Sequence, residues 1–207
     1  LSYAGIEEAL IESEHILMRL LMCSRSELYL SEGTQAPEDV QKIFLEIIER
    51  RKSRKPLAYL LGEAYFGGQA LKVGPACLIP RPETEILVEG ILKNIPDRFF
   101  RFLDIGTGSG AIAIAILLNR KNAEGALIDI SEEALKIAKQ NIKGFSLENR
   151  AEILCSDLFK AIPRERKWDV IVSNPPYLAD PDWGEVSPEI KYEPRLALDG
   201  GKDGLDF

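Results

Sequence analysis

The sequence is poor in the side chains that most metal centres and nucleophilic sites need. Its 207 residues include one histidine, His15, and three cysteines, Cys23, Cys77 and Cys155, which lie far apart without a CxxC pair. A histidine-based metal site or a Ser-His triad therefore cannot be assembled. Widely spaced cysteines in odd number favour buried free thiols in a reducing compartment. His15 lies off the apolar stripe of its predicted helix, and we expect it at the surface.

Long apolar runs and an excess of basic charge are also missing. No run is long and apolar enough to cross a membrane and no signal peptide is evident, so we expect a cytoplasmic protein without a membrane partner. The formal net charge is −7. Because a protein that binds chiefly to nucleic-acid phosphates needs a basic face, we predict no direct sequence-specific contact with nucleic acid. With 45% hydrophobic residues the chain can bury a core.

Residues 1–55 predict a small helical domain. Apolar residues at helical spacing predict a first helix that ends near Met22, followed by a polar turn. Pro37 opens a second helix, which ends in the basic run Arg50 to Lys55. Two interpretations of this run stay open, because it can complement the helix dipole or dock onto an acidic or RNA-rich partner. The apolar stripe of the first helix comprises Ile6, Leu10, Ser13, Leu17, Leu20 and Leu21.

The rest of the chain predicts an α/β fold. Residues 56–80 predict a linker with a β-hairpin around a Gly67-Gly68 turn. From residue 81 to residue 207 strands alternate with helices, which indicates βαβ units and a mainly parallel sheet. The predicted strands are 102–105, 125–129, 151–155 and 168–173, and the predicted helices start near residues 83, 111 and 132.

A glycine-rich turn, Gly106-Thr107-Gly108-Ser109-Gly110, separates the first of these strands from a helix. Its glycines allow a tight turn and close backbone approach, and the following helix offers amide donors to a ligand. The GxGxG spacing differs from the GxGxxG of the dinucleotide fingerprint, and no Lys-Ser/Thr pair follows as in a P-loop. The turn alone is weak evidence for any one ligand.

Acidic residues follow successive strands at the same edge, where open α/β sheets bind ligands. Asp104, just before the glycines, could face an ammonium group, and Asp129 could accept both hydroxyls of a ribose. Asp157 could meet an exocyclic amine while the apolar Leu158 covers a ring. Each acid alone is equally compatible with a capped or solvated surface residue. Together they predict a nucleoside site.

The segment Asn174-Pro175-Pro176-Tyr177 follows the last predicted strand. Its two prolines fix φ and remove two backbone donors, which leaves carbonyl oxygens directed at the site. An Asn oxygen, the carbonyl of Pro175 and a flat Tyr ring together suit a planar –NH2 group, because two acceptors take its hydrogens while the ring packs on its face. A rigid loop without function is the alternative for this segment alone.

These residues together resemble the class I S-adenosylmethionine-dependent methyltransferases that act on planar amino groups. Three further segments, Leu78 to Glu85, Tyr192 to Leu198 and Gly200 to Gly204, are similar to the HemK/PrmC release-factor glutamine methyltransferases. The resemblance covers nearly the whole chain. The residues Pro82 to Glu85 favour a release factor as substrate over the ribosomal protein that a sister enzyme modifies.

The resemblance implies a Rossmann-like sheet preceded by a small helical domain and a hairpin linker. It assigns residues 1–55 to substrate recognition and residues 81–207 to an S-adenosylmethionine-binding catalytic domain. The family's sheet has seven strands and this chain supplies about four, so we expect its C-terminal strands to be missing. The implied cofactor contacts are Gly106, Thr107, Gly108, Ser109 and Gly110 around the methionine part, Asp104, Asp129 on the ribose, Asp157 and Leu158 at the adenine, and also Asn174 and Thr84. Asn174 and Pro175 would hold the substrate amide, with Pro176 and Tyr177 against it.

The implied reaction transfers a methyl group from S-adenosylmethionine to N5 of the glutamine in the Gly-Gly-Gln motif of peptide chain release factors, which act in translation termination. The by-product is S-adenosylhomocysteine, and the enzyme is expected to be a monomer. The alternatives are an aminomethyltransferase for DNA adenine or an rRNA base, an enzyme for a ribosomal-protein glutamine, and a cofactor-binding module without activity. The chain's own Gly67-Gly68-Gln69 repeats the substrate tripeptide, but two glycines in a hairpin predict a turn.

Overall fold

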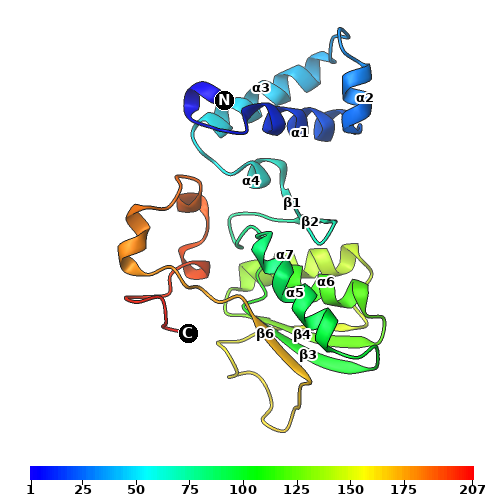
Figure 1. The fold of residues 1–207 in the computed structure, drawn as a ribbon, viewed down its shortest axis with the longest axis vertical. Coiled ribbons are helices and arrows are strands. Elements are labelled where there is room, and N and C mark those ends of the chain that lie inside the picture. The colour runs from blue at the N-terminus through cyan, green and yellow to red at the C-terminus, as the bar shows by residue number, and fades with distance from the viewer. The chain divides into compact units, whose positions relative to one another are not determined.

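The computed structural model describes residues 1–207, which form two compact units (Figure 1). The helical unit consists of Leu1–Leu61 together with Ser187–Tyr192. The sheet unit consists of Gly62–Val186 together with Glu193–Phe207. The helical unit is therefore discontinuous in sequence, since six residues from the C-terminal part of the chain belong to it.

The helical unit contains α1 (Ala9–Leu21), α2 (Arg25–Leu30), α3 (Glu38–Lys52) and α4 (Leu57–Leu61). The two helices expected from periodicity are α1 and α3. The prediction of a polar turn after Met22 was wrong for Arg25–Leu30, because these residues form the helix α2. This short helix begins at a capping box, in which the Ser24 hydroxyl accepts from the Glu27 amide while the Glu27 carboxylate accepts from the Ser24 amide.

The core of the helical unit is small and includes Ile6, Ile16, Ile47 and Tyr59. The predicted stripe of the first helix was wrong at Leu10, which is 69% exposed, while Ile16 is fully buried. Because α1 starts only at Ala9, Ile6 lies outside the helix and its spacing to Leu10 has no helical phase. His15 is exposed, as predicted.

The sheet unit contains four parallel strands in the order β5-β4-β3-β6. Their bounds are β3 (Phe100–Ile105), β4 (Ala123–Asp129), β5 (Ala151–Cys155) and β6 (Val170–Ser173), and they alternate with α5 (Glu83–Asn94), α6 (Ala111–Asn119) and α7 (Glu132–Gly144). An antiparallel hairpin of β1 (Glu63–Phe66) and β2 (Gln69–Lys72) precedes them, with Gly67 and Gly68 at positive φ in its turn. The expected α/β fold, the parallel sheet and the hairpin are confirmed.

Helices α5, α6 and α7 pack on one face of the sheet (Figure 1). Their apolar side chains meet Phe100, Phe102 and Leu127 in the main core. The opposite face carries a smaller cluster in which Leu103, Ala126 and Ile128 are covered by Ile162 and Trp168 from the β5–β6 connection.

The register of the sheet brings a glycine against an aromatic ring. Phe102 of β3 pairs with Gly125 of β4, and a Cβ atom added to Gly125 would lie 2.3 Å from Cζ of Phe102. Since Phe102 is fully buried, its ring has no room to move away. A side chain at residue 125 is therefore incompatible with this packing.

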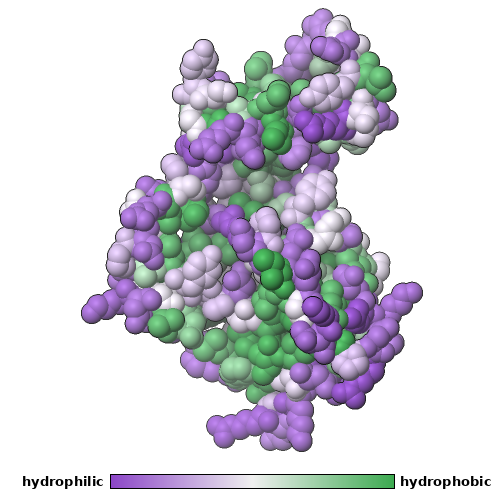
Figure 2. All heavy atoms as spheres, in the orientation of Figure 1, coloured by the Kyte–Doolittle hydropathy of each residue, from purple (hydrophilic) through white to green (hydrophobic).

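After β6 the chain forms three short 3₁₀ helices, η2 (Asp180–Gly184), η3 (Ile190–Tyr192) and η4 (Arg195–Ala197). All three cysteines are free, but only Cys77 is buried, so the expectation of buried thiols was wrong for the exposed Cys155. No helix has both the length and the apolar character needed to cross a lipid bilayer. Figure 2 shows apolar side chains exposed among hydrophilic ones on the surface.

Candidate active site

The glycine-rich turn leaves the end of β3 in a conformation that needs glycine. Gly106, Gly108 and Gly110 have φ values of 68°, 56° and 84°. The amide of Thr107 donates to the carbonyl of Ile128 at 3.0 Å, which fixes the turn to β4. A Cβ atom on Gly106 would have no atom within 4 Å. The turn therefore presents bare backbone to open space.

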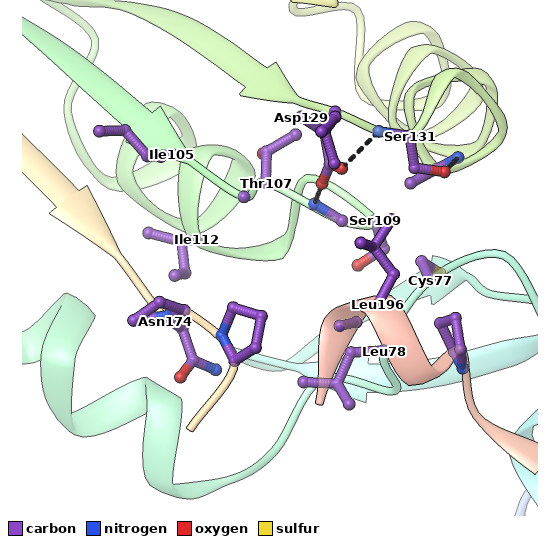
Figure 3. Close-up of a pocket in the computed structure, with 18 of the residues that line it drawn as sticks. Cys77, Leu78, Ile105, Thr107, Ser109, Ile112, Asp129, Ser131, Asn174 and Leu196 are labelled. Atoms are coloured by element: carbon purple, nitrogen blue, oxygen red, sulfur yellow. Dashed lines mark hydrogen bonds between the residues drawn. The ribbon is translucent and has the colours of Figure 1, made fainter. Parts of the chain in front are cut away.

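Asp129 ends β4 and holds the glycine turn with its carboxylate. Its Oδ2 accepts from the amide of Gly108 and its Oδ1 accepts from the amide of Ser131, both at 2.9 Å (Figure 3). Ser131 in turn caps α7 by accepting from the amide of Ala134 at 3.2 Å. Each carboxylate oxygen accepts one of these bonds and retains a further lone pair, so Asp129 can still accept from a ligand.

Asp104 lies beneath the turn. It is fully buried, and its Oδ2 accepts from the Thr107 hydroxyl at 2.6 Å. Burial raises the pKa of Asp104 to about 7, against the opposing effect of the Thr107 hydrogen bond. Asp104 does not line the cavity described below, and it supports the turn through its bond to Thr107.

Asn174 lies directly after β6, where the Ser173 hydroxyl donates to the carbonyl of Ile105 at 2.9 Å and fixes the strand end to β3. The Nδ2 of Asn174 donates to the Thr84 hydroxyl at 3.2 Å. This bond orients the side-chain amide of Asn174. Asn174 and Pro175 both line the cavity described below, and the Oδ1 of Asn174 can accept a hydrogen bond from a ligand.

One cavity of about 330 Å³ brings most of the predicted site residues together. Its size lies in the range of small-ligand pockets. The predicted residues that line it are Thr84, Gly106, Thr107, Gly108, Ser109, Asp129, Asp157, Leu158, Asn174, Pro175 and Pro176. The predicted residues outside its lining are Asp104, Gly110 and Tyr177.

Tyr177 is 65% exposed. Its carbonyl oxygen is approached closely by Gly204, where an added Cβ atom would lie 2.6 Å away. Gly204 has a φ of 80°, so this position needs glycine for both its backbone and its contact. Gly204 therefore serves close packing against Tyr177, the residue that follows the two prolines.

Apolar residues from distant segments complete the walls, and motif reading could not identify them. They include Phe66 of the hairpin, Leu78, Ile112 and Leu196. Figure 3 shows Cys77, Leu78 and Leu196 drawn together at this cavity although they are far apart in the sequence. Burial raises the pKa of the Cys77 thiol to about 11, which makes it a neutral part of the wall.

Asn141 is a further positioning residue that sequence reasoning missed. It is 3% exposed in α7, and its Nδ2 donates to the carbonyls of Ser109 and Lys72 at 2.8 and 2.9 Å. Its Oδ1 accepts from the amide of Lys72 at 2.8 Å. One buried side-chain amide thus ties the glycine turn to the hairpin. The only signal in the sequence is an Asn in the stripe of α7 that contains Leu135, Ala138 and Ile142.

No group of three or more His, Cys, Asp or Glu residues is arranged so that it could hold a metal ion. The polar groups at the cavity are instead amides, hydroxyls and single carboxylates. This donor set suits a polar organic ligand with hydroxyl and amine groups.

Two family models match the chain. Residues 1–62 match the PrmC N-terminal domain, and residues 82–188 match the Methyltransferase small domain. Together these matches leave residues 63–81 and 189–207 outside them.

Similar proteins occur in bacteria. The chain is 42% identical over 196 residues to a release factor glutamine methyltransferase of Coxiella burnetii, with 94% of this chain and 69% of that protein covered. It is 38% identical over 200 residues to the protein of that name in Bacillus cereus, with 94% and 70% covered. Among solved structures, the hMettl16 catalytic domain aligns with a TM-score of 0.52 at 16% identity, over 68% of this chain and 54% of that one, which supports the fold.

Proposed function

Because the chain belongs to the family of release factor glutamine methyltransferases, we propose that it methylates a peptide chain release factor. The methyl group passes from S-adenosylmethionine to the side-chain nitrogen N5 of the glutamine in the Gly-Gly-Gln motif. The observation that carries this proposal is the placement of Asn174 beside Thr84 in the same cavity as the glycine turn and Asp129.

The cavity suits S-adenosylmethionine. It is bordered by bare glycine backbone at Gly106, by the carboxylate of Asp129 and by apolar walls, which match the polar tail, the ribose and the adenine of the cofactor. We assign the ribose hydroxyls to Asp129 and the adenine edge to Asp157 and Leu158. When bound, the cofactor supplies a methyl group already activated by its sulfonium centre.

Asn174 and Pro175 prepare the substrate amide. Resonance withdraws the lone pair of an amide nitrogen, so it is a poor nucleophile. The Oδ1 of Asn174 and the carbonyl of Pro175 accept its two hydrogens, which aims the nitrogen and disperses the positive charge that develops on it. Thr84 supports this role by holding the other end of the Asn174 amide. The site needs no strong base, because the methylated amide is a strongly acidic cation that passes its proton to water after methyl transfer.

The helical unit is the part that we assign to recognition of the release factor. The remaining expectations about partners belong to the same proposal: the enzyme acts as a monomer in the cytoplasm and uses no nucleic acid as substrate. The net charge of −7 supports the last of these, since a nucleic-acid substrate favours a basic binding surface.

The proposal is tested with Asn174→Ala, and with Asn119→Ala as a matched control on α6 outside the cavity. We expect Asn174→Ala to bind S-adenosylmethionine within about threefold of the parent and to lose roughly 100-fold in turnover, as for removal of one positioned polar group. Calorimetry measures the binding and mass spectrometry of the release-factor glutamine measures the turnover. Normal methylation by Asn174→Ala, or transfer to duplex DNA or a ribosomal protein instead, would show the proposal to be wrong.

A further inference from the structure

The loop that follows the Asn174–Tyr177 motif is closed at its base. The amide of Leu178 donates to the carbonyl of Leu198 at 2.8 Å, and the amide of Gly200 donates to the carbonyl of Leu178 at 2.9 Å. Leu178 and Asp199 also form a parallel bridge. We call residues 178–199 the motif loop. Because its base lies directly after Tyr177, a displacement of the loop acts on the proposed substrate-binding residues.

The tip of the motif loop, residues 187–192, belongs to the helical unit. Its anchor is Glu189, whose Oε1 accepts from Nη1 of Arg51 at 2.9 Å. The same carboxylate binds Arg54, with Oε1 2.8 Å from Nε and Oε2 2.8 Å from Nη2. One carboxylate therefore joins two arginines of the basic run, and Arg51 also lies in the last turn of α3, as the helix-dipole interpretation expects.

This anchor differs from an exposed ion pair. Arg51 is 5% exposed and also donates to both carboxylate oxygens of Glu12, at 2.7 and 2.9 Å. Burial acts to lower the pKa of Arg51, but the hydrogen bonds that Arg51 donates to Glu12 and Glu189 outweigh it and raise that pKa. Burial likewise acts to raise the pKa of Glu189, and its bonds to Arg54 and Arg51 lower it overall. The anchor is therefore fully charged at neutral pH.

The part of the motif loop that follows its tip, from Glu193 onward, is bonded within the sheet unit. Glu193, which is 7% exposed, accepts from the amide of Ile79 at 3.0 Å and from the guanidinium of Arg81. Pro194 and Leu196, which follow it, line the cavity. Tyr192 and Glu193, which are neighbours along the chain, thus belong to two different units.

We propose that Glu189 is a positioning residue for methyl transfer, and that its bonds to Arg51 and Arg54 let the helical unit set the geometry of the motif loop. This inference rests on the proposed function, because it takes the helical unit as the part that recognises the release factor. Binding of the release factor to that unit then affects, through the motif loop, the positions of the residues that hold the substrate amide.

The test compares Glu189→Gln with Glu185→Gln in the full chain. Glu185 lies on the same loop with an exposed side chain, so its change leaves the anchor intact. In Glu189→Gln the charge is lost while Arg51 keeps Glu12, so the chain still folds. At a temperature well below unfolding, we expect kcat to fall about 10- to 100-fold, the effect of a small misplacement of reacting groups, and KM for the release factor to stay within about twofold.

The conservative variant Glu189→Asp retains the charge and is expected to recover part of the lost kcat. An unchanged kcat in Glu189→Gln, with a loss of thermal stability alone, would reduce Glu189 to a structural residue and overturn the proposal. A raised KM with an unchanged kcat would assign Glu189 to substrate affinity and would overturn it as well.

A second readout separates this inference from the proposed function. Amide hydrogen exchange at Ala197 and Leu198, whose amides donate to Pro194 and Arg195, is expected to accelerate at least about tenfold in Glu189→Gln and to stay at the parent rate in Glu185→Gln. This measurement needs no substrate. If the parent failed to methylate a release factor, the proposed function would fall, and an unchanged exchange rate in Glu189→Gln would independently overturn the inference.

Discussion

Asp104 shows how one buried side chain links the fold to the site. Its carboxyl group holds Thr107 at the start of the glycine turn while lying outside the cavity. Burial raises its pKa to about 7, far above the usual value for an aspartate. The folded protein therefore retains a proton on Asp104 at a pH at which the unfolded chain has released it.

This difference predicts a pH dependence of stability. Between about pH 4 and about pH 7 the folded state binds more protons at Asp104 than the unfolded state, so stability falls as the pH rises, by at most about 1.4 kcal/mol per pH unit. We expect the free energy of unfolding of the parent minus that of Asp104→Asn to fall over this range and to level off above about pH 7. Urea titrations at several pH values measure it, and a constant difference would contradict the burial argument.

At the scale of single residues, the sequence allows the prediction of residues that lie in recognisable motifs. It does not allow the prediction of residues whose role depends on packing in the folded chain. The glycine turn, Asp129 and Asn174 could all be identified from their order along the chain, and the cavity brings them together. Asn141 could not, because a single Asn in the apolar stripe of α7 does not show which groups it bonds. Its role depends on Ser109 and Lys72, which only the folded chain brings to it.

The regular elements follow closely from local pattern. The strands β3 to β6 and the helices α5 to α7 were predicted within about two residues, because alternating apolar strands and capped helices carry strong periodic signals. The short helices α2 and α4 were missed, since five or six residues are too few for periodicity to appear. Their formation depends on a cap in one case and on the burial of Tyr59 in the other.

Strand β4 offers a test of element packing. Gly125→Ala is expected to destabilise the protein by about 1–3 kcal/mol, because its Cβ atom would overlap the buried ring of Phe102. Gly90→Ala, in the exposed part of α5 with no atom within 4 Å of the added Cβ, is the matched control and is expected to stabilise by up to about 1 kcal/mol. Denaturant unfolding measures both, and equal effects of the two changes would rule out the proposed overlap.

At the scale of the whole molecule, the discontinuous helical unit is the feature that no local pattern could predict. Residues 187–192 have neither a helical period nor a motif, and the sequence places them beyond the catalytic strands. They join the helical unit through the pairing of Glu189 with Arg51 and Arg54, which are 135 to 138 residues away along the chain. Long-range charge pairing of this kind leaves no periodic trace.

A separated segment 1–61 should therefore be less stable than the same residues in the full chain. Without Glu189, Arg54 loses its carboxylate partner and Arg51 retains only Glu12. We expect local stability in α1 and α3 to drop by about 1–3 kcal/mol, as for the loss of hydrogen bonds to charged groups. Amide hydrogen exchange of the segment and of the full chain measures this drop, and equal protection in the two would contradict the contribution of Glu189.

The same discontinuity affects the order in which the protein can form during synthesis. A nascent chain emerges from the ribosome with α1 to α4 first, and domains generally fold in that order. Here the first-made unit has to wait for Ser187–Tyr192, which emerge only after all four parallel strands. Within residues 1–207 the helical unit is thus among the last parts to be finished, and a product that ends before residue 187 would carry Arg54 without its carboxylate partner.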